Sequence, residues 1–159
     1  MKVARSGLGS AILGDALFVA GGSNNNSPLS SVERYDIETD KWSQIADMLV
    51  PRSGLGVTNL DTNTLLALGG WSDNEKLKTV EMYDSRENKW RPMASMKTVK
   101  SALRAVTVGS YVYAIGGYDG EKPLSVVERY DPRMDVWETV GELKHAKYSF
   151  GVGVVNVNV

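Results

Sequence analysis

Short apolar runs that each end in two glycines recur three times along this chain of 159 residues. The runs occupy residues 16–20, 64–68 and 111–115. Their length and their aliphatic and aromatic content predict buried β-strands. A pair of glycines then permits a turn with positive φ, or the close approach of another segment, which a side chain would obstruct. The hydrophobic pattern therefore predicts a repeated β-structure.

Other positions follow the same period. The glycine pairs begin at Gly21, Gly69 and Gly116, which are 48 and 47 residues apart. In each unit a tyrosine follows 13 residues after the second glycine, and a tryptophan follows seven residues later. Residues 31–36 alternate apolar and polar side chains with a period of two, which is typical of a strand. We therefore predict four strands per unit, in the first unit at residues 6–13, 16–20 and 31–36 and around Trp42.

The spacing of Gly-Gly, Tyr, Trp and a following Met or Leu resembles the kelch repeat. The sequence Ser-Val-Glu-Arg-Tyr-Asp at residues 31–36 and its near copy at 125–131 strengthen the resemblance. It implies an all-β fold made of kelch-type β-propeller blades, each with four antiparallel strands. Complete blades are expected at about residues 4–50, 51–97 and 98–144, and one extra first strand at about 146–157. The chain is thus similar to the last three blades and the closing strand of the six-bladed kelch domain of BTB–kelch proteins.

Half of a six-bladed ring would expose apolar blade faces at both ends, and such faces favour association. We therefore expect a homodimer in which two copies complete a six-bladed ring. In that ring the extra strand of one copy competes with residues 6–13 of the other copy for a single position.

Composition and charge exclude several classes of partner. The chain has 18 Lys plus Arg, 19 Asp plus Glu, and no cysteine. No basic cluster suggests nucleic acid or an anionic membrane surface, and no apolar run is long enough for a bilayer. Residues 1–5 lack the apolar core of a signal peptide. We therefore expect a cytoplasmic protein that binds no nucleic acid and no membrane.

Function is expected where the repeats differ from one another. The residue after each glycine pair is Ser23, Trp71 or Tyr118. The resemblance to BTB–kelch proteins implies a partner-binding face made of these loops and of the residue after each repeated basic residue. Residue by residue, the implied face consists of Ser6, Ser23, Ser53, Trp71, Lys76, Ser101, Tyr118 and Tyr148. The alternative for Trp71 is a ring folded onto its own blade, and Pro28 and Pro123 stand where relatives often carry a polar contact residue.

Arg104 departs from the repeat, because the other units have glycine at Gly9, Gly56 and Gly151. The resemblance places this strand beside the central channel. Arg104 therefore belongs to the predicted partner-binding residues and suggests a protein or peptide ligand with acidic residues.

The repeated aromatic and charged residues are interpreted as structural. The tyrosines and tryptophans are expected between strands and between blades rather than on a ligand platform. The recurring basic residues, Arg5, Arg52, Lys100 and Lys147, are expected to pair with backbone carbonyls or with the third-strand glutamates. Those glutamates are Glu33, Glu81 and Glu128.

Catalysis finds little support in the sequence. His145 is the only histidine, without a Ser-His-Asp arrangement or a metal-ligand spacing. Residues 116–122 contain glycines and a lysine, but Lys122 precedes Pro123 rather than Ser or Thr and a helix, so a phosphate loop is disfavoured. We predict a non-catalytic protein-recognition module that needs no metal or other cofactor. By resemblance it is part of a cullin-type ubiquitin-ligase adaptor, with an actin-associated kelch protein or a sugar-processing propeller enzyme as alternatives.

Overall fold

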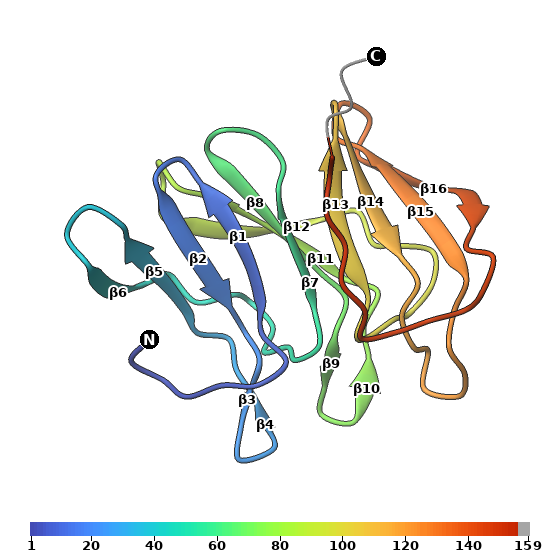
Figure 1. Ribbon diagram of the computed structural model, residues 1–159, viewed down its shortest axis with the longest axis horizontal. Coiled ribbons are helices and arrows are strands. Elements are labelled where there is room, and N and C mark those ends of the chain that lie inside the picture. Colours follow the sequence, from blue (N-terminus) through green and yellow to red (C-terminus); the bar gives the residue numbers. More distant parts are fainter. Residues whose placement is uncertain (156–159) are drawn as a thin grey trace.

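Three four-stranded antiparallel sheets lie side by side, and each sheet is one repeat of the sequence (Figure 1). The computed structural model describes residues 1–155. Within each sheet the four strands pair in the order in which they occur along the chain. These sheets are the predicted blades, and the all-β prediction is confirmed over the described residues.

Blade 1 contains β1 (Gly9–Leu13), β2 (Ala16–Ala20), β5 (Val32–Asp36) and β6 (Lys41–Ile45). Blade 2 contains β7 (Gly56–Asn59), β8 (Thr64–Leu68), β11 (Val80–Asp84) and β12 (Lys89–Met93). Blade 3 contains β13 (Arg104–Val108), β14 (Tyr111–Ile115), β15 (Val126–Asp131) and β16 (Val136–Glu142). Two short hairpins add β3 (Ser23–Asn24) with β4 (Ser27–Pro28) and β9 (Trp71–Ser72) with β10 (Glu75–Lys76).

The first strand starts later than the sequence predicts. Residues 6–13 were expected to be extended throughout, but β1 begins at Gly9. Gly7 adopts a φ of +62°, which turns the chain, and Ser6 instead makes an isolated bridge with Ser23. The segment before β1 therefore belongs to the loop end of the molecule rather than to the sheet.

The hydrophobic core lies between adjacent blades. One cluster joins blade 1 to blade 2, where the rings of Phe18 and Tyr83 are 6.0 Å apart, and a second cluster joins blade 2 to blade 3. The tryptophans of blades 2 and 3 reach back across these interfaces, since Nε1 of Trp90 donates to the carbonyl of Ala46 and Nε1 of Trp137 to that of Ala94. The predicted structural role of the repeated aromatic residues is thus confirmed for Tyr83, Trp90 and Trp137.

The glycine pairs are required where one blade meets the next. Gly69 has a φ of +59°, and a Cβ at this position would lie 2.5 Å from the carbonyl oxygen of Lys100. Gly70 has a φ of +96°, and its Cβ would lie 2.8 Å from the carbonyl oxygen of Ser53. Both predicted reasons for the pair, positive φ and close backbone approach, therefore apply at this junction.

The expected extra strand at residues 146–157 does not form a strand over residues 146–155, and residues 156–157 lie outside the described residues. A strand needs a neighbour, and the second strand of a fourth blade is not among the described residues. The segment nevertheless docks on blade 3 as the preceding units dock on theirs. The amide of Lys147 donates to the carbonyl of Leu124, just as that of Arg52 donates to Leu29.

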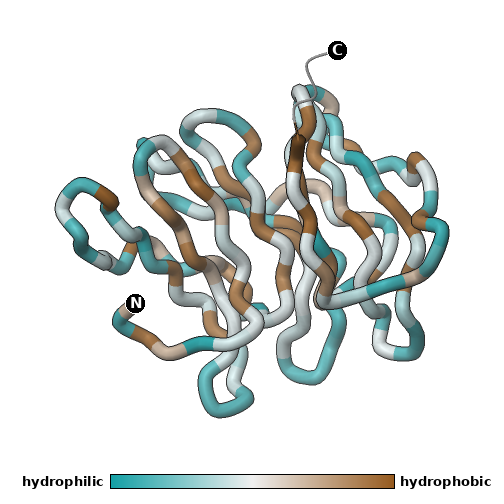
Figure 2. Tube along the Cα trace, in the orientation of Figure 1, coloured by the Kyte–Doolittle hydropathy of each residue, from teal (hydrophilic) through white to brown (hydrophobic). Residues whose placement is uncertain are grey.

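Hydrophilic residues gather in the loops beyond the glycine pairs, while hydrophobic residues lie mainly within the strands (Figure 2). None of the described residues belongs to a helix of the length and hydropathy that crossing a membrane requires.

Candidate functional site

The loops that follow the glycine pairs project from one end of the molecule, where Figure 1 shows the hairpins β3–β4 and β9–β10. Each loop is closed at its base by a backbone hydrogen bond of 2.8 Å to the second glycine of the pair. The donors are the amides of Leu29, Leu77 and Leu124. The hairpin tips use Asn and Asp residues with positive φ, as two-residue hairpin turns require. The loops are thus short and firmly attached, and we call this end the loop face.

The structure brings the predicted site residues together in pairs. Antiparallel bridges join Ser6 to Ser23, Ser53 to Trp71 and Ser101 to Tyr118. In the Ser53–Trp71 pair the two backbone hydrogen bonds measure 2.8 and 3.0 Å. The residue after each glycine pair is therefore held against the residue after each repeated basic residue.

Of the three serines that follow a repeated basic residue, two lie beneath this face rather than on it. The exposed fraction is 3% for Ser53 and 5% for Ser101. The hydroxyl of Ser101 donates to the carbonyl of Tyr118 at 3.3 Å. In this structure Ser53 and Ser101 position their aromatic neighbours, while Ser6 is exposed. Burial of this kind depends on how adjacent blades stack, so the repeat pattern alone gave no signal for it.

Aromatic side chains of blades 2 and 3 and of the tail belong to the loop face. The rings of Tyr118 and Tyr148 are 5.6 Å apart, and Tyr148 is 52% exposed. The ammonium of Lys76 lies 5.8 Å from the centroid of the Trp71 ring, and Trp71 is half-buried. A Cβ at Gly120 would lie 3.6 Å from Cγ of Lys76, so the loops of blades 2 and 3 meet. Four predicted residues thus form one continuous aromatic and cationic surface.

A cavity of about 490 Å³ lies along the first strands of the blades. It is lined by Gly9 of β1, Gly56 of β7, Arg104 of β13 and residues 149–152 of the tail, among others. Among the described lining residues only Arg104 carries a charge, and one of its guanidinium nitrogens donates to the carbonyl of Leu103 at 2.9 Å. Arg104 therefore places a positive charge in this cavity beside the first strands.

Three of the four repeated basic residues, Arg5, Arg52 and Lys100, form the predicted buried ion pairs with the third-strand glutamates, whereas Lys147 is exposed and pairs with no described residue. Arg52 and Glu81 are 2.6 Å apart, and the amides of Leu49 and Val50 donate to the same carboxylate. Equivalent contacts surround Glu33 (Lys2, Val3 and Arg5) and Glu128 (Lys97, Thr98 and Lys100). We call each set of two amides and one basic side chain a carboxylate clamp. It belongs to the framework and not to the loop face.

Electrostatics at the first clamp favour the ionised glutamate. Burial raises the pKa of Glu33, but hydrogen bonds from the amides of Lys2 and Val3 and from Arg5 outweigh it, so the pKa lies below its ordinary value. A carboxylate held in this way contributes to stability only while it is charged.

A second repeated contact is absent from the sequence predictions. The hydroxyls of Tyr83 and Tyr130 donate to Asn88 and Asp135, whose side chains in turn accept the amides of Ala46 and Ala94 in the preceding blade. An Asp or Asn five residues after each repeated tyrosine was the available signal.

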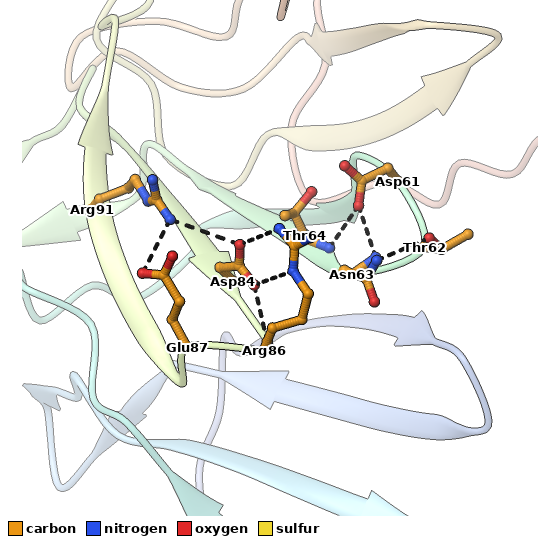
Figure 3. Close-up of polar contacts among 8 residues, drawn as sticks. All are labelled: Asp61, Thr62, Asn63, Thr64, Asp84, Arg86, Glu87 and Arg91. Atoms are coloured by element: carbon orange, nitrogen blue, oxygen red, sulfur yellow. Dashed lines mark hydrogen bonds and ion pairs between the residues drawn. The ribbon is translucent and has the colours of Figure 1, made fainter.

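A polar cluster at the opposite end of blade 2 has a structural explanation (Figure 3). Asp61 accepts the amides of Asn63 and Thr64, which fixes the hairpin turn before β8. Hydrogen bonds from Arg86, aided by the charge of Arg91, hold the pKa of Asp84 far below its usual range. The described residues contain no group of three or more His, Asp or Glu side chains that could hold a metal ion. The strand β15, not a helix, follows Lys122, so this segment has no phosphate-loop geometry.

Comparison with known proteins identifies the repeats. The family model of the kelch motif matches residues 4–49, 51–97 and 101–144. A stretch of 53 residues is 53% identical to the influenza virus NS1A-binding protein homolog of Xenopus laevis and 49% identical to that of Mus musculus. Each match covers 33% of this chain but only 8% of the relative, so the chain matches a small part of these proteins.

Among solved structures, that of YjhT superposes with a TM-score of 0.82 over 92% of this chain and 54% of its own. At 16% identity this likeness concerns the fold alone. The family model matches all three blades in sequence, which no chance similarity of fold would produce. The chain therefore belongs to the kelch-repeat family.

Proposed function

We propose that the loop face binds a protein or peptide, with Trp71, Lys76, Tyr118 and Tyr148 as its main contact residues. Kelch propellers are protein-interaction modules, and the two relatives are named for binding a viral protein. The observation that carries the proposal is the aromatic and cationic surface on loops that are closed by backbone hydrogen bonds. Aromatic side chains on a rigid support lose little entropy on binding and commonly dominate the affinity.

The test begins with peptides selected on the chain from a random peptide library. Binding is then measured by fluorescence anisotropy for Trp71→Ala and Tyr118→Ala. We expect each variant to bind at least about tenfold more weakly, as for interface residues that contribute well over 1 kcal/mol. Tyr111→Ala is the matched control, because Tyr111 lies at the start of β14, the end opposite Tyr118. Affinity that stays unchanged in both loop variants refutes the proposed face.

Arg104 supports a preference for acidic ligands. Its charge lies in a cavity whose other described lining residues are uncharged, so a carboxylate there meets an attractive field without a competing anion. A double-mutant cycle provides the test, pairing Arg104→Gln with replacement of each acidic residue of a selected peptide by its amide. We expect Arg104→Gln to weaken binding of the acidic peptide. It should leave unchanged the binding of the peptide in which the acidic residue that contacts Arg104 is replaced by its amide. If the free-energy effects of Arg104→Gln and of the peptide substitution are additive for every acidic residue, the proposed preference for acidic ligands is contradicted.

The parent protein is proposed to be a cytoplasmic substrate adaptor of a cullin-based ubiquitin ligase, since the repeats resemble those of BTB–kelch proteins. In that setting the loop face holds the substrate. Purification of the full-length protein from cells should recover a cullin scaffold. Recovery of actin filaments without a cullin would favour the actin-associated alternative instead.

Self-association is the last part of the proposal. The chain superposes on 54% of YjhT, and a second copy of the chain would supply an equal number of blades. We expect two copies to form one ring, because each copy then covers the open blade face of the other.

A further inference from the structure

We propose that residues 144–147 are a fourth carboxylate clamp and that it holds Glu33 of a second copy of this chain. This inference rests on the proposed self-association and names the contact that would join the two copies. Each of the three clamps within the chain consists of two consecutive amides followed, two residues later, by a basic side chain. The segment Lys144-His145-Ala146-Lys147 has the same spacing and closely parallels Lys2-Val3-Ala4-Arg5.

The fourth segment is already in position. The amide of Gly117 donates to the carbonyl of Lys147 at 2.9 Å, as that of Gly70 donates to Lys100. The amide of Ser149 donates to the carbonyl of Ala102 at 2.9 Å, as that of Ala102 donates to Gly54. Thus blade 3 holds the end of this segment where the next blade would meet it, and in Figure 1 the chain that follows it runs beside β13.

The fourth segment differs from the others in having no glutamate. The basic side chains of the other clamps are fully buried against their carboxylates, with 0% exposure for Arg5, Arg52 and Lys100. Lys147 is exposed and makes no ion pair with any described residue. A glutamate on the third strand of an adjoining blade is the chemical group that this arrangement fits.

The outer faces of blades 1 and 3 are complementary. Inside the chain, Phe18 and Val32 of blade 1 are buried against Tyr83 and Trp90 of blade 2. In blade 3, Tyr113 and Val127 correspond to Phe18 and Val32 but are only half-buried. In blade 1, Tyr35 and Trp42 correspond to Tyr83 and Trp90 and are likewise half-buried.

The second copy therefore docks blade 1 on blade 3 of the first copy, in the same way as successive blades dock within one chain. Trp42 of one copy then lies over Gly141 of the other, since Gly141 corresponds to Ala46 and Ala94 and is exposed. Two such head-to-tail contacts satisfy both open faces, and a closed pair leaves no face for further growth.

Docking requires an exchange of segments. Residues 2–5 of the second copy already hold its own Glu33, so residues 144–147 of the first copy must replace them. Val152 and Val154 of the incoming segment correspond to Ser10 and Ile12 of the displaced segment. Val152 thus supplies a β-branched side chain where the displaced segment has Ser10, and β-branched residues favour a strand.

The mass of the 159-residue chain is the first test. Sedimentation equilibrium between about 1 and 100 µM should approach twice 17.3 kDa, with a concentration-dependent midpoint. A mass of one chain over this range overturns both the clamp and the self-association, while peptide binding to the loop face would remain intact.

A matched pair of charge reversals tests the clamp itself. Lys147→Glu places a second carboxylate against Glu33 and should raise the dimer dissociation constant at least about tenfold. Lys144→Glu changes the net charge equally, but the clamp uses only the backbone amide of Lys144, so this variant should dimerise within about twofold of the wild type. A wild-type dissociation constant for Lys147→Glu overturns the clamp while leaving the dimer in place.

Weakening the hold of residues 2–5 on Glu33 should strengthen the dimer. Arg5→Ala removes the side chain that holds Glu33 within one chain, so the exchanged Lys147 gains an advantage. We expect the dimer dissociation constant to fall at least about threefold, and the double variant with Lys147→Ala to lose this gain. An unchanged or weaker dimer in Arg5→Ala overturns the exchange, and if this variant does not fold the two charge reversals still decide the proposal.

Discussion

Three basic residues at equivalent positions make unequal contacts. The guanidinium of Arg52 reaches the carbonyls of Gly69 and Thr79 at 2.9 and 3.0 Å in addition to Glu81. The ammonium of Lys100 lies 2.8 Å from a carboxylate oxygen of Glu128, but its angles do not satisfy a hydrogen bond to any described residue. Burial lowers the pKa of Lys100, although Glu128 partly opposes this effect. A planar fork can serve carbonyls and a carboxylate together, which a point charge does less well.

We predict that Lys100→Arg stabilises the protein. The new guanidinium would reach two carbonyls, and each such bond adds about 0.5–1.5 kcal/mol, so the free energy of unfolding should rise by about 1–2 kcal/mol. Urea denaturation measures the change, and Arg52→Lys is the reciprocal control, which should lower the free energy of unfolding. A loss of stability in Lys100→Arg would contradict the geometric equivalence of the blades.

At the scale of elements, the junction after each second strand is the most constrained part of a blade. Gly69 and Gly14 have nearly equal φ values of +59° and +57°, but their surroundings differ. A Cβ at Gly69 would meet the carbonyl oxygen of Lys100 at 2.5 Å, whereas nothing lies within 4 Å of a Cβ at Gly14. Gly69 is therefore required for the packing of adjacent blades, whereas Gly14 is required only for the hairpin between β1 and β2.

This difference gives a prediction with an internal control. Gly14→Ala should cost about 1–2 kcal/mol, the strain of a left-handed residue alone. Gly69→Ala adds overlap with backbone that cannot move freely and should cost at least about 2 kcal/mol more. Thermal and urea unfolding of the two variants separate the cost of positive φ from the cost of overlap with the neighbouring backbone. Equal losses would mean that the close approach of blades contributes little.

The sequence predicts the elements well where a repeat is reinforced by chemistry. The strands, the glycine junctions and the Arg–Glu pairs follow from residue type and spacing. It predicts the site less well, because Ser53 and Ser101 repeat like Ser6 but are buried by a neighbouring blade. It also gives no sign of the irregular pairing at Val127 and Glu128, where β16 carries an extra residue. Burial and register of this kind depend on contacts between units rather than on the pattern within one unit.

For the molecule as a whole, ionised carboxylates attach the N-terminal segment to blade 1 and fix the turn between β11 and β12. The pKa of Glu33 and that of Asp84 lie below their ordinary values of 4.5 and 3.8. Between its folded and unfolded pKa values, each group binds more protons in the unfolded chain than in the folded one. Their contribution is therefore fully present above the unfolded values and is lost as the pH falls through the folded ones.

We accordingly expect the midpoint of thermal unfolding to fall steadily as the pH is lowered from about 5 to about 2. Asp84→Asn should make this fall shallower, because the amide does not titrate and Arg86 remains in solvent contact. Scanning calorimetry over this range measures both slopes. An unfolding midpoint that does not depend on pH would contradict the assignment of charged, stabilising carboxylates.

The bond at the base of each loop has a consequence for how such proteins diversify. Because Leu29, Leu77 and Leu124 each close a loop on the second glycine of its pair, the residues at the loop tips carry little of the framework. Insertions and substitutions there can accumulate while the blades keep their register. Evolution can thus vary ligand choice blade by blade, and a protein engineer could randomise the same short segments as a combinatorial binding surface.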